Sequence, residues 1–368
     1  MLKGGIFKSK SGNYELPIFF PDATRAFVKA VDGKDLENTK TIGILVNTYH
    51  LYKDLGISVV KKFGGIGNFM GWNKIIISDS GGFQVMTLAK RDSKKGRVDD
   101  NGVTFKPIGD KKVVLTPEDS IRFQLDLKTD LVVVLDDFTP PNVNYEEARE
   151  SVRRTVLWAK RSKEEFTRIC KERKMGSDQK PYLIGVVQGG DYLELRKKCT
   201  QDLVEIGFDG LGYGGWPITT EGIFNYEVAE VIADFSPSNY LLYGLGVGKP
   251  DEIVECNRLG FQIFDCVLPT RDARHKRLYV YDASSIDEID LAADKFYSYY
   301  VPDKERYYRD ESPISRACDC LLCKNYSRGY LAHLFRSKET SALRLSTIHN
   351  LRFYSLLMEK IRHSYKNN

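Results

Sequence analysis

One short segment of the chain carries more chemically useful side chains than any other. Within residues 261–274, an apolar run leads into Asp265, and Pro269 then ends the strand. Arg271 and Arg274 follow on the exit loop. A carboxylate at the end of a buried strand is desolvated, so it must be paired or take part in function. Two arginines beyond it suit phosphate better than a protein core. The alternative is a buried aspartate that caps a neighbouring loop.

Two further acids, Asp79 and Asp136, also follow apolar runs that read as strands. Exchange of a base on a ribose needs one carboxylate to attack the anomeric carbon and a second acid/base to move the proton of the base. A third carboxylate suits the amine and ring N–H of a guanine-like base, because those donors need an acceptor. The alternative is that these acids bind Mg²⁺ or cap helices, as in many barrels.

A cluster of metal-binding residues lies near the C-terminus. Cys318, Cys320 and Cys323 fall within six residues, and His349 follows on a helical stretch. Three thiolates this close can converge on one ion with an imidazole as the fourth ligand, a set that favours zinc. Four protein ligands leave no site for water, so such a zinc would be structural. His333 competes with His349 as the fourth ligand, and a chance cluster of free thiols is the alternative.

Short apolar runs alternate with amphipathic helical patterns along the chain and would position these side chains. Strands are expected at 42–47, 75–78, 131–135, 182–187, 210–213, 241–245 and 262–267. Helices are expected at 117–127, 145–171, 192–206, 223–235 and 251–259. This alternation predicts an α/β fold with a parallel sheet, and the number of units favours a (β/α)8 TIM barrel. An open doubly wound sheet is the alternative, but no Gly-rich phosphate fingerprint follows the first strand.

Polar and glycine residues follow each expected strand, at the end where a barrel builds its active site. We expect residues 1–285 to form the barrel, with a polar excursion at 89–115 that holds a small β insertion around 103–105 and 113–115. Residues 286–368 would form a C-terminal zinc-binding subdomain and helices that complete the barrel.

The bulk composition indicates a soluble protein with a sizeable core. The chain has 368 residues, 42% of them hydrophobic, and a net charge of +5, which permits nucleic-acid binding without demanding it. No apolar run reaches the length of a membrane helix, and the N-terminus lacks the apolar core of a signal peptide, so we expect a cytoplasmic protein without a membrane partner. Seven cysteines do not suggest a disulfide framework.

Several motifs together resemble the tRNA-guanine transglycosylase family, in order and over about residues 4–363. They are Asp-Ser-Gly-Gly-Phe-Gln at 79–84, Gln188-Gly189, Gly214-Gly215, Gly-Val-Gly-Lys-Pro at 246–250, the Asp265 segment and the cysteine cluster. By this resemblance, Asp265 is the nucleophile and Asp79 the general acid/base. The family's metal pattern also selects His349 over His333 as the fourth ligand of one structural Zn²⁺.

The resemblance implies roles for further residues. The residues that contact the base would be Asp136, Gln188 and Gly215, and those that sandwich it Phe83 and Leu245. The residues that face the anticodon-loop backbone would be Arg271, Arg274 and Lys249. The family flips out the wobble guanine of a tRNA and replaces it with a 7-deazaguanine in the queuosine pathway, which suits chemistry on an extruded base. We therefore expect tRNA as the partner, and a homodimer.

Two positions depart from the family's bacterial pattern. Relatives that use 7-aminomethyl-7-deazaguanine have a small cysteine near Phe138, and Gly-Gly-Leu-Ala-Val where this chain has a tryptophan at 216. The acid that follows in them has Thr220 or Glu221 as its nearest counterpart here. Phe138 and Trp216 would therefore reshape the base pocket. The incoming base stays open among 7-aminomethyl-7-deazaguanine, 7-cyano-7-deazaguanine and queuine.

Two other functions remain as alternatives to tRNA modification. A paralogue that modifies guanine in DNA would share the fold and the acids and differ in its nucleic-acid contacts. A non-catalytic partner subunit would keep the zinc and lose the acids. The presence of Asp79, Asp136 and Asp265 argues against that second alternative.

Overall fold

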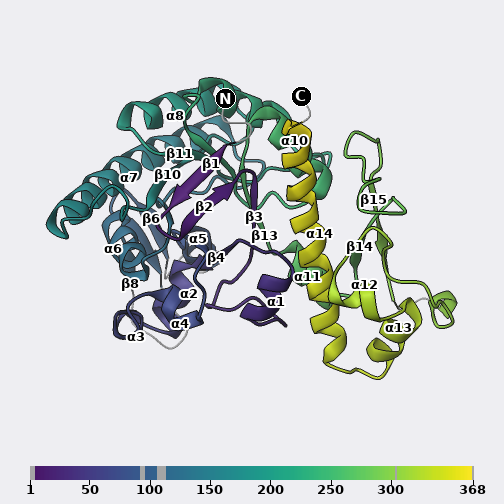
Figure 1. Ribbon diagram of the computed structural model, residues 1–368. Helices are drawn as coiled ribbons and strands as arrows, with labels where there is room; N and C mark the ends of the chain where they lie inside the picture. The colour runs from purple at the N-terminus through teal and green to yellow at the C-terminus, as the bar shows by residue number, and fades with distance from the viewer. Residues whose placement is uncertain (1–4, 92–95, 106–112, 303–304, 367–368) are drawn as a thin grey trace.

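A barrel of parallel strands forms the centre of the molecule (Figure 1). The computed structural model describes residues 5–91, 96–105, 113–302 and 305–366. Its main sheet has eight strands, hydrogen-bonded in the order β3-β13-β12-β11-β10-β9-β5-β4. The strands are β3 (Ile18–Pro21), β4 (Gly43–Asn47), β5 (Ile75–Asp79), β9 (Leu131–Val133), β10 (Tyr182–Val187), β11 (Gly210–Tyr213), β12 (Leu241–Gly244) and β13 (Ile263–Cys266). A bridge between Asp22 and Leu45 brings β3 and β4 together, which confirms the predicted (β/α)8 barrel.

One strand of the barrel, β3, was not predicted. It is four residues long, ends on Pro21 and follows a hairpin instead of a helix, so it lacks the strand–helix alternation that marks the others. Its residues are all buried, and it pairs with β13 through Ile18 and Ile263. As a consequence, β4 is the second strand of the barrel, and Asp265 lies at the end of the eighth.

Helices cover the outside of the barrel (Figure 1). The five predicted helices are α6 (Pro117–Leu127), α7 (Tyr145–Glu172), α8 (Leu193–Ile206), α9 (Tyr226–Phe235) and α10 (Pro250–Leu259). Local signals set their ends: Thr116 accepts a hydrogen bond from Asp119 N at 3.1 Å, and Gly260 ends α10 with a left-handed φ of 113°. Strand residues such as those of β4 and β12 are buried throughout, because helices on one side and the barrel interior on the other exclude water.

Shorter helices lie between the first strands. They are α1 (Gly33–Asn38), α2 (Thr48–Asp54), α3 (Ile57–Lys62), α4 (Ile66–Met70) and α5 (Gly82–Arg91). The predicted β insertion follows α5 as a three-stranded antiparallel sheet of β6 (Arg97–Asp99), β7 (Gly102–Phe105) and β8 (Val113–Leu115). The strand β6 was not predicted, and residues 92–95 and 106–112 of the insertion lie outside the described residues.

A hairpin covers the N-terminal end of the barrel. It consists of β1 (Ile6–Ser9) and β2 (Gly12–Glu15), paired in antiparallel register. The Tyr182 hydroxyl donates to Lys8 O at 2.8 Å, and Lys10 Nζ donates to Thr129 O at 2.9 Å, so the hairpin is tied to the starts of β10 and β9. The cavity described below opens at the opposite end of the barrel, where the strands finish.

The C-terminal part of the chain packs beside the barrel (Figure 1). It contains α11 (Leu268–Arg274), β14 (Leu278–Tyr281), β15 (Tyr297–Tyr300), η1 (Glu305–Tyr307), α12 (Leu321–Asn325), α13 (Arg328–Arg336) and α14 (Ser341–Lys366). The long helix α14 contacts β3, where the rings of Phe19 and Tyr354 lie 4.4 Å apart. The part of the chain predicted as a separate subdomain, 286–368, contains the elements from β15 to α14.

The sequence predicted neither a disulfide framework nor a membrane helix. The seven cysteines are all free, so the structure contains no disulfide between them. None of the helices in the described part of the chain combines the length and apolar character needed to cross a bilayer.

Candidate active site

A cavity of about 370 Å³ opens at the C-terminal ends of the barrel strands. Eight of the residues singled out in the sequence lie on its wall: Asp79, Phe83, Asp136, Phe138, Gly215, Trp216, Leu245 and Asp265. They come from the ends of five strands or the loops and helix that follow them, and the closed barrel brings them together. Their separation in the sequence therefore says little about their distances in space.

Asp265 lies near the end of β13 and has two hydrogen-bond donors. The hydroxyl of Tyr243 donates to its Oδ1 at 2.6 Å, and the main-chain N–H of Gly246 donates to the same oxygen at 3.0 Å. Burial raises the pKa of Asp265 to about 6, whereas these two hydrogen bonds favour the ionised form. Tyr243 is fully buried, which raises its own pKa well above the ordinary value and keeps it a donor. Asp265 itself lines the cavity.

Asp79 ends β5 and is held by a denser set of donors. Asn47 Nδ2 donates to Oδ2 at 2.7 Å, and the main-chain N–H groups of Thr48 and Gly81 donate to Oδ1 at 3.1 and 3.0 Å. Burial nonetheless raises the pKa of Asp79 to about 7, and the negative charge of Asp265 adds to the rise. The cavity therefore contains carboxyl groups whose pKa values are raised by burial toward neutral pH, which suits acid/base chemistry.

Asp136 follows β9 and is paired with an amide. Gln188 Nε2 donates to its Oδ2 at 2.6 Å, and Gln188 Oε1 accepts from Thr139 N at 3.1 Å, which fixes the orientation of that amide. Burial raises the pKa of Asp136 to about 6, against the effect of this hydrogen bond. Gln188 itself is fully buried and lies behind the cavity wall, so it reaches the cavity through Asp136.

The remaining wall of the cavity is apolar and aromatic. The rings of Phe83 and Phe138 meet edge to face, with centroids 5.0 Å apart. Leu245 lies on the wall as well, and Trp216 is 49% exposed at the cavity's edge. A flat slot between such side chains, with carboxylates at its polar side, is suited to a heterocyclic base.

Sequence reasoning did not identify the residues that hold these carboxylates. Asn47, Tyr243 and Gly246 lie at strand ends, and their positions gave no sign of which acid they would meet. Glu252 also reaches the cavity wall, from the first turn of α10. Its carboxylate forms an ion pair with Lys249 at 2.9 Å.

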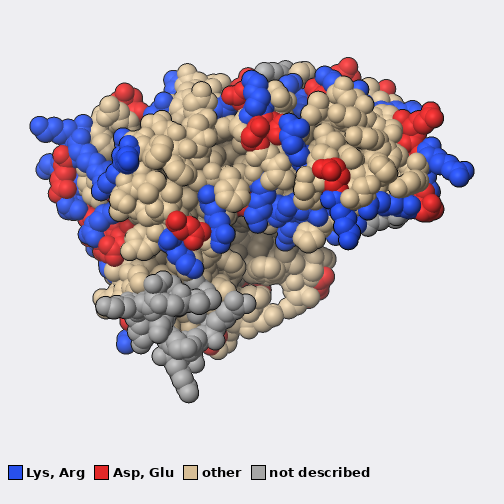
Figure 2. Space-filling model, turned by 90° about the horizontal axis from the view of Figure 1, so that it is seen from below, with Lys and Arg blue, Asp and Glu red and all other residues tan. Residues whose placement is uncertain are grey.

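The predicted phosphate-binding residues lie outside the cavity. Arg271 and Arg274 were expected on a loop, but Pro269 stands in the first turn of the helix α11, which carries both arginines. Proline is compatible with the first turn of a helix, which explains this error. Their spacing of three residues places them on one side of α11. On the face seen in Figure 2, Lys and Arg side chains gather along a hollow of the surface.

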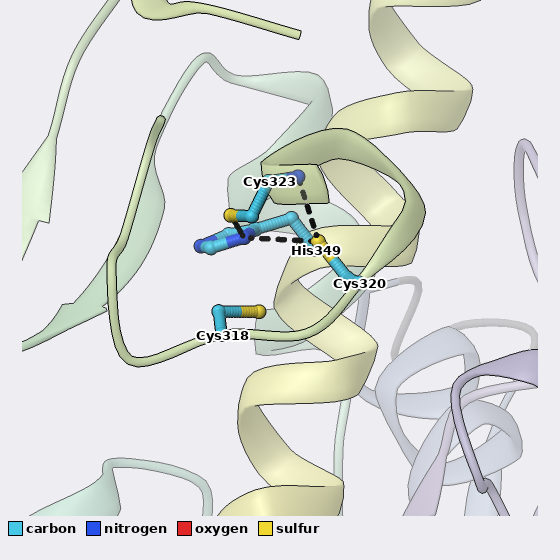
Figure 3. A group of neighbouring side chains, drawn as sticks. All are labelled: Cys318, Cys320, Cys323 and His349. Carbon is cyan, nitrogen blue, oxygen red and sulfur yellow. Dashed lines mark hydrogen bonds between the residues drawn. The ribbon is translucent and has the colours of Figure 1, made fainter. Parts of the chain in front are cut away.

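The predicted metal ligands come together between α12 and α14 (Figure 3). Ligand atoms of Cys318, Cys320, Cys323 and His349 all lie within 4.8 Å of one another. His349 Nδ1 is 3.5 Å from Cys320 Sγ and 3.3 Å from Cys323 Sγ. The competing ligand His333 is exposed on α13 and does not belong to this group. The cluster can therefore hold a metal ion, with the ligand set expected.

A hydrogen bond on the far side of the imidazole supports this arrangement. His349 Nε2 donates to Tyr279 O at 2.7 Å, and Nδ1 is the ring nitrogen directed at the thiols. Metal-binding histidines usually donate their second ring nitrogen in this way. His349 is fully buried, so β14 and α14 fix the ring before any ion binds.

The sequence as a whole was then compared with known proteins. A family model described as "Queuine tRNA-ribosyltransferase" matches residues 3–368. A queuine tRNA-ribosyltransferase of Thermoanaerobacter sp. (strain X514) is 38% identical over 363 residues, which is 98% of this chain and 89% of the relative. One of Methylacidiphilum infernorum (isolate V4) is 40% identical over 360 residues, 97% of this chain and 90% of the relative. The chain belongs to the queuine tRNA-ribosyltransferase family of transferases.

Proposed function

We propose that the protein exchanges the wobble guanine of a tRNA anticodon for a 7-deazaguanine base, in the queuosine pathway. The observation that carries this proposal is the single cavity in which Asp79, Asp136 and Asp265 meet at the ends of β5, β9 and β13. Relatives along nearly the whole chain are named for the transfer of queuine to tRNA, which supports the same class of substrates.

In the first half of the reaction, Asp265 is the nucleophile. A carboxylate oxygen forms a bond to C1′ of the ribose while the C1′–N9 bond to guanine breaks, and the departing base takes the electron pair. The hydrogen bonds from Tyr243 and Gly246 to Oδ1 orient the carboxylate and leave Oδ2 for the attack. The product of this step is a covalent Asp265–ribose ester.

Asp79 moves the proton in both halves of the exchange. With its pKa raised to about 7, it holds a proton that it can give to the departing guanine. The ionised Asp79 then takes the N9 proton of the incoming base, whose nitrogen attacks C1′ and releases Asp265 as a carboxylate. Each half-reaction uses the proton that the other leaves behind, so the enzyme returns to its starting state.

The base is recognised by polar groups on one edge and held between side chains on its faces. Asp136 accepts from the ring N–H and exocyclic amine, and the amide of Gln188 keeps that carboxylate in place. Gly215 offers a main-chain N–H to the oxo group. Phe83 and Leu245 lie on the two faces of the base.

Phe138 and Trp216 set the space for the substituent at position 7 of the base. Both are large rings on the cavity wall, in contrast to the smaller side chains of relatives that take the aminomethyl base. We infer that this chain differs from them in its ranking of the aminomethyl, cyano and queuine bases.

The cysteine and histidine cluster binds one structural Zn²⁺. Its donors lie 3.3–3.5 Å apart where His349 meets Cys320 and Cys323, close to the edge of a tetrahedron whose metal–ligand bonds are about 2.0–2.3 Å. When bound, the zinc links the loop at 318–323 to α14 and takes no part in the chemistry.

The tRNA lies across the face that carries the cavity. Arg271, Arg274 and Lys249 contact the phosphates of the anticodon loop, and the protein acts as a homodimer in the cytoplasm. Lys249 also pairs with Glu252, so its charge is partly engaged within the protein.

The test is incorporation of labelled guanine into nucleic acid. The protein is incubated with the labelled base and either bulk tRNA or duplex DNA, and Asp265→Asn serves as the matched inactive control. Incorporation into tRNA and not DNA supports the proposal. Incorporation into DNA alone would establish the DNA-modifying alternative, and incorporation into neither would point to the non-catalytic subunit.

A further inference from the structure

A fully buried arginine lies directly behind the cavity wall. Arg196, in the first turn of α8, is 1% exposed, and its guanidinium donates to three main-chain carbonyls. Nε donates to Gly190 O at 2.8 Å, and Nη1 donates to Val187 O at 2.6 Å and to Gly214 O at 2.8 Å. The guanidinium also lies 5.1 Å from the ring centroid of Tyr213.

No carboxylate among the described residues lies within ion-pair distance of Arg196, which is unusual for a buried charge. Desolvation by burial lowers the pKa of Arg196. An apolar side chain of similar size would fill the space between helix and barrel at a smaller desolvation cost. Packing alone therefore does not account for an arginine at this position.

The hydrogen bond from Arg196 to Gly214 O also affects the N–H of Gly215, which belongs to the same peptide unit. Gly214 C=O and Gly215 N–H belong to one planar trans peptide unit, so they point in opposite directions. Arg196 holds the oxygen from behind, and Gly214 and Gly215 both line the cavity. A carbonyl that accepts a hydrogen bond from a cation also polarises the N–H of its own peptide unit.

The backbone is fitted closely around this guanidinium at two glycines. At Gly215, φ is +85°, and a Cβ there would lie 3.1 Å from Gln188 Oε1 and 3.2 Å from Arg196 Nη2. At Gly189, φ is +143°, and a Cβ would lie 2.9 Å from Arg196 N. Both positions favour glycine for their conformation and leave little room for a side chain beside Arg196.

We propose that Arg196 is a positioning residue of the base site. It fixes and polarises the Gly214–Gly215 peptide so that Gly215 N–H donates to the 6-oxo group of the bound base. The other two hydrogen bonds of Arg196, to Val187 O and Gly190 O, hold the neighbouring turn that carries Gln188. This inference rests on the proposed function, and Arg196 acts through the main chain without touching the base.

The test compares two bases that differ at position 6. 6-Thioguanine keeps the ring N–H and amine of guanine but replaces the oxygen with sulfur, a weaker acceptor. In the exchange assay with tRNA, KM is measured for guanine and Ki for 6-thioguanine, for the wild type, Arg196→Lys and Arg196→Gln. For both variants we expect KM for guanine to rise by about threefold to tenfold more than Ki for 6-thioguanine, the change expected for one hydrogen bond.

Arg362→Lys is the matched control, because Arg362 also donates to a main-chain carbonyl, that of Pro17 at 2.7 Å, on the far side of the barrel. It should leave the ratio of the two constants unchanged. Thermal unfolding and zinc content show whether each variant is folded. If one of the two Arg196 variants does not fold, the other still gives the comparison. Equal shifts for both bases, or no shift, would overturn the role of Arg196. A wild type that incorporates no guanine would instead overturn the proposed function.

Discussion

The base cavity and the metal cluster both gather ionisable side chains, but they do so in opposite ways. The four metal ligands lie within 4.8 Å of one another, and three of them come from six consecutive residues at the start of α12. The cavity's carboxylates come from three strands, and each has its own hydrogen-bond donors. In the cluster the groups face each other and need a cation between them. In the cavity the groups face an open space of about 370 Å³ and need a substrate.

This difference separates a structural role from a chemical one. A closed set of four protein ligands has no position left for a reacting molecule. Carboxylates whose burial raises the pKa to about 6 or 7 are poised to exchange protons near neutral pH. Changes in the two regions should therefore affect different properties, and the following predictions test that division.

The largest effect is expected for Asp265→Asn. An amide cannot attack the anomeric carbon, so exchange should fall by about 10⁴-fold or more, and no covalent complex with tRNA should form. Zinc content and thermal stability should stay near those of the wild type. Exchange assays and denaturing gels with tRNA measure both effects, and substantial remaining activity would remove Asp265 from this role.

Asp79→Asn should lower exchange by about 10²- to 10⁴-fold, the usual contribution of a general acid/base. It should also change the pH profile. In the wild type, exchange falls as pH drops through about 6, because Asp265 becomes protonated, and falls above about 7, because Asp79 loses its proton. If the exchange rate of Asp79→Asn no longer decreases above about pH 7, the assignment of Asp79 is supported. A decrease that persists would point to another acid.

Cys320→Ala should affect the metal cluster and leave the chemistry of folded molecules intact. We expect loss of the zinc and a decrease of more than about 4 kcal/mol in the free energy of unfolding, because metal binding orders this region. Metal analysis and denaturant unfolding measure these changes. An unchanged zinc content would disprove the ligand assignment. Cys170→Ala, at a buried cysteine outside the cluster, is the matched control.

Phe138→Cys combined with Trp216→Leu should change which base the protein prefers. Removing two rings from the cavity wall should alter the relative affinities of guanine, the cyano and aminomethyl bases and queuine by about tenfold, the effect of a change in packed volume. Competition against labelled guanine measures the ranking. If the aminomethyl base wins clearly in the wild type and the ranking is the same in the double variant, the pocket inference is wrong. Phe235→Leu, at an exposed ring on α9, is the control.

The smallest effect is expected for Arg271→Ala and Arg274→Ala. Each lost phosphate contact should weaken tRNA binding and reduce the slope of its salt dependence by about one unit, with little change in affinity for the free base. Binding measured at several salt concentrations gives the slope, and Arg149→Ala on α7 is the control. An altered base affinity at an unchanged slope would place these arginines at the pocket instead.

Local signals in the sequence determined much of the architecture. Buried strands need apolar side chains on both faces, so seven of the eight barrel strands could be recognised as apolar runs, and Thr116 and Gly260 marked helix ends through their capping chemistry. The strand β3 was missed because a strand of four residues that ends on Pro21 is too short to show periodicity. The three cysteines of the metal cluster were found because thiols close in sequence must also be close in space, whereas His349 was chosen over His333 only by the family resemblance.

Only the tertiary structure decided which groups meet at the cavity. Asn47 pairs in register with Asp79 on the neighbouring strand, and the Tyr243 hydroxyl reaches from β12 to Asp265 on β13, because neighbouring parallel strands end close together. The sequence likewise could not identify Arg196 as a functional residue, because it does not show which main-chain carbonyls the guanidinium of Arg196 will reach. The sequence determines which strand ends carry acids, but their partners and their desolvation, and so their pKa values, depend on how the barrel closes around them.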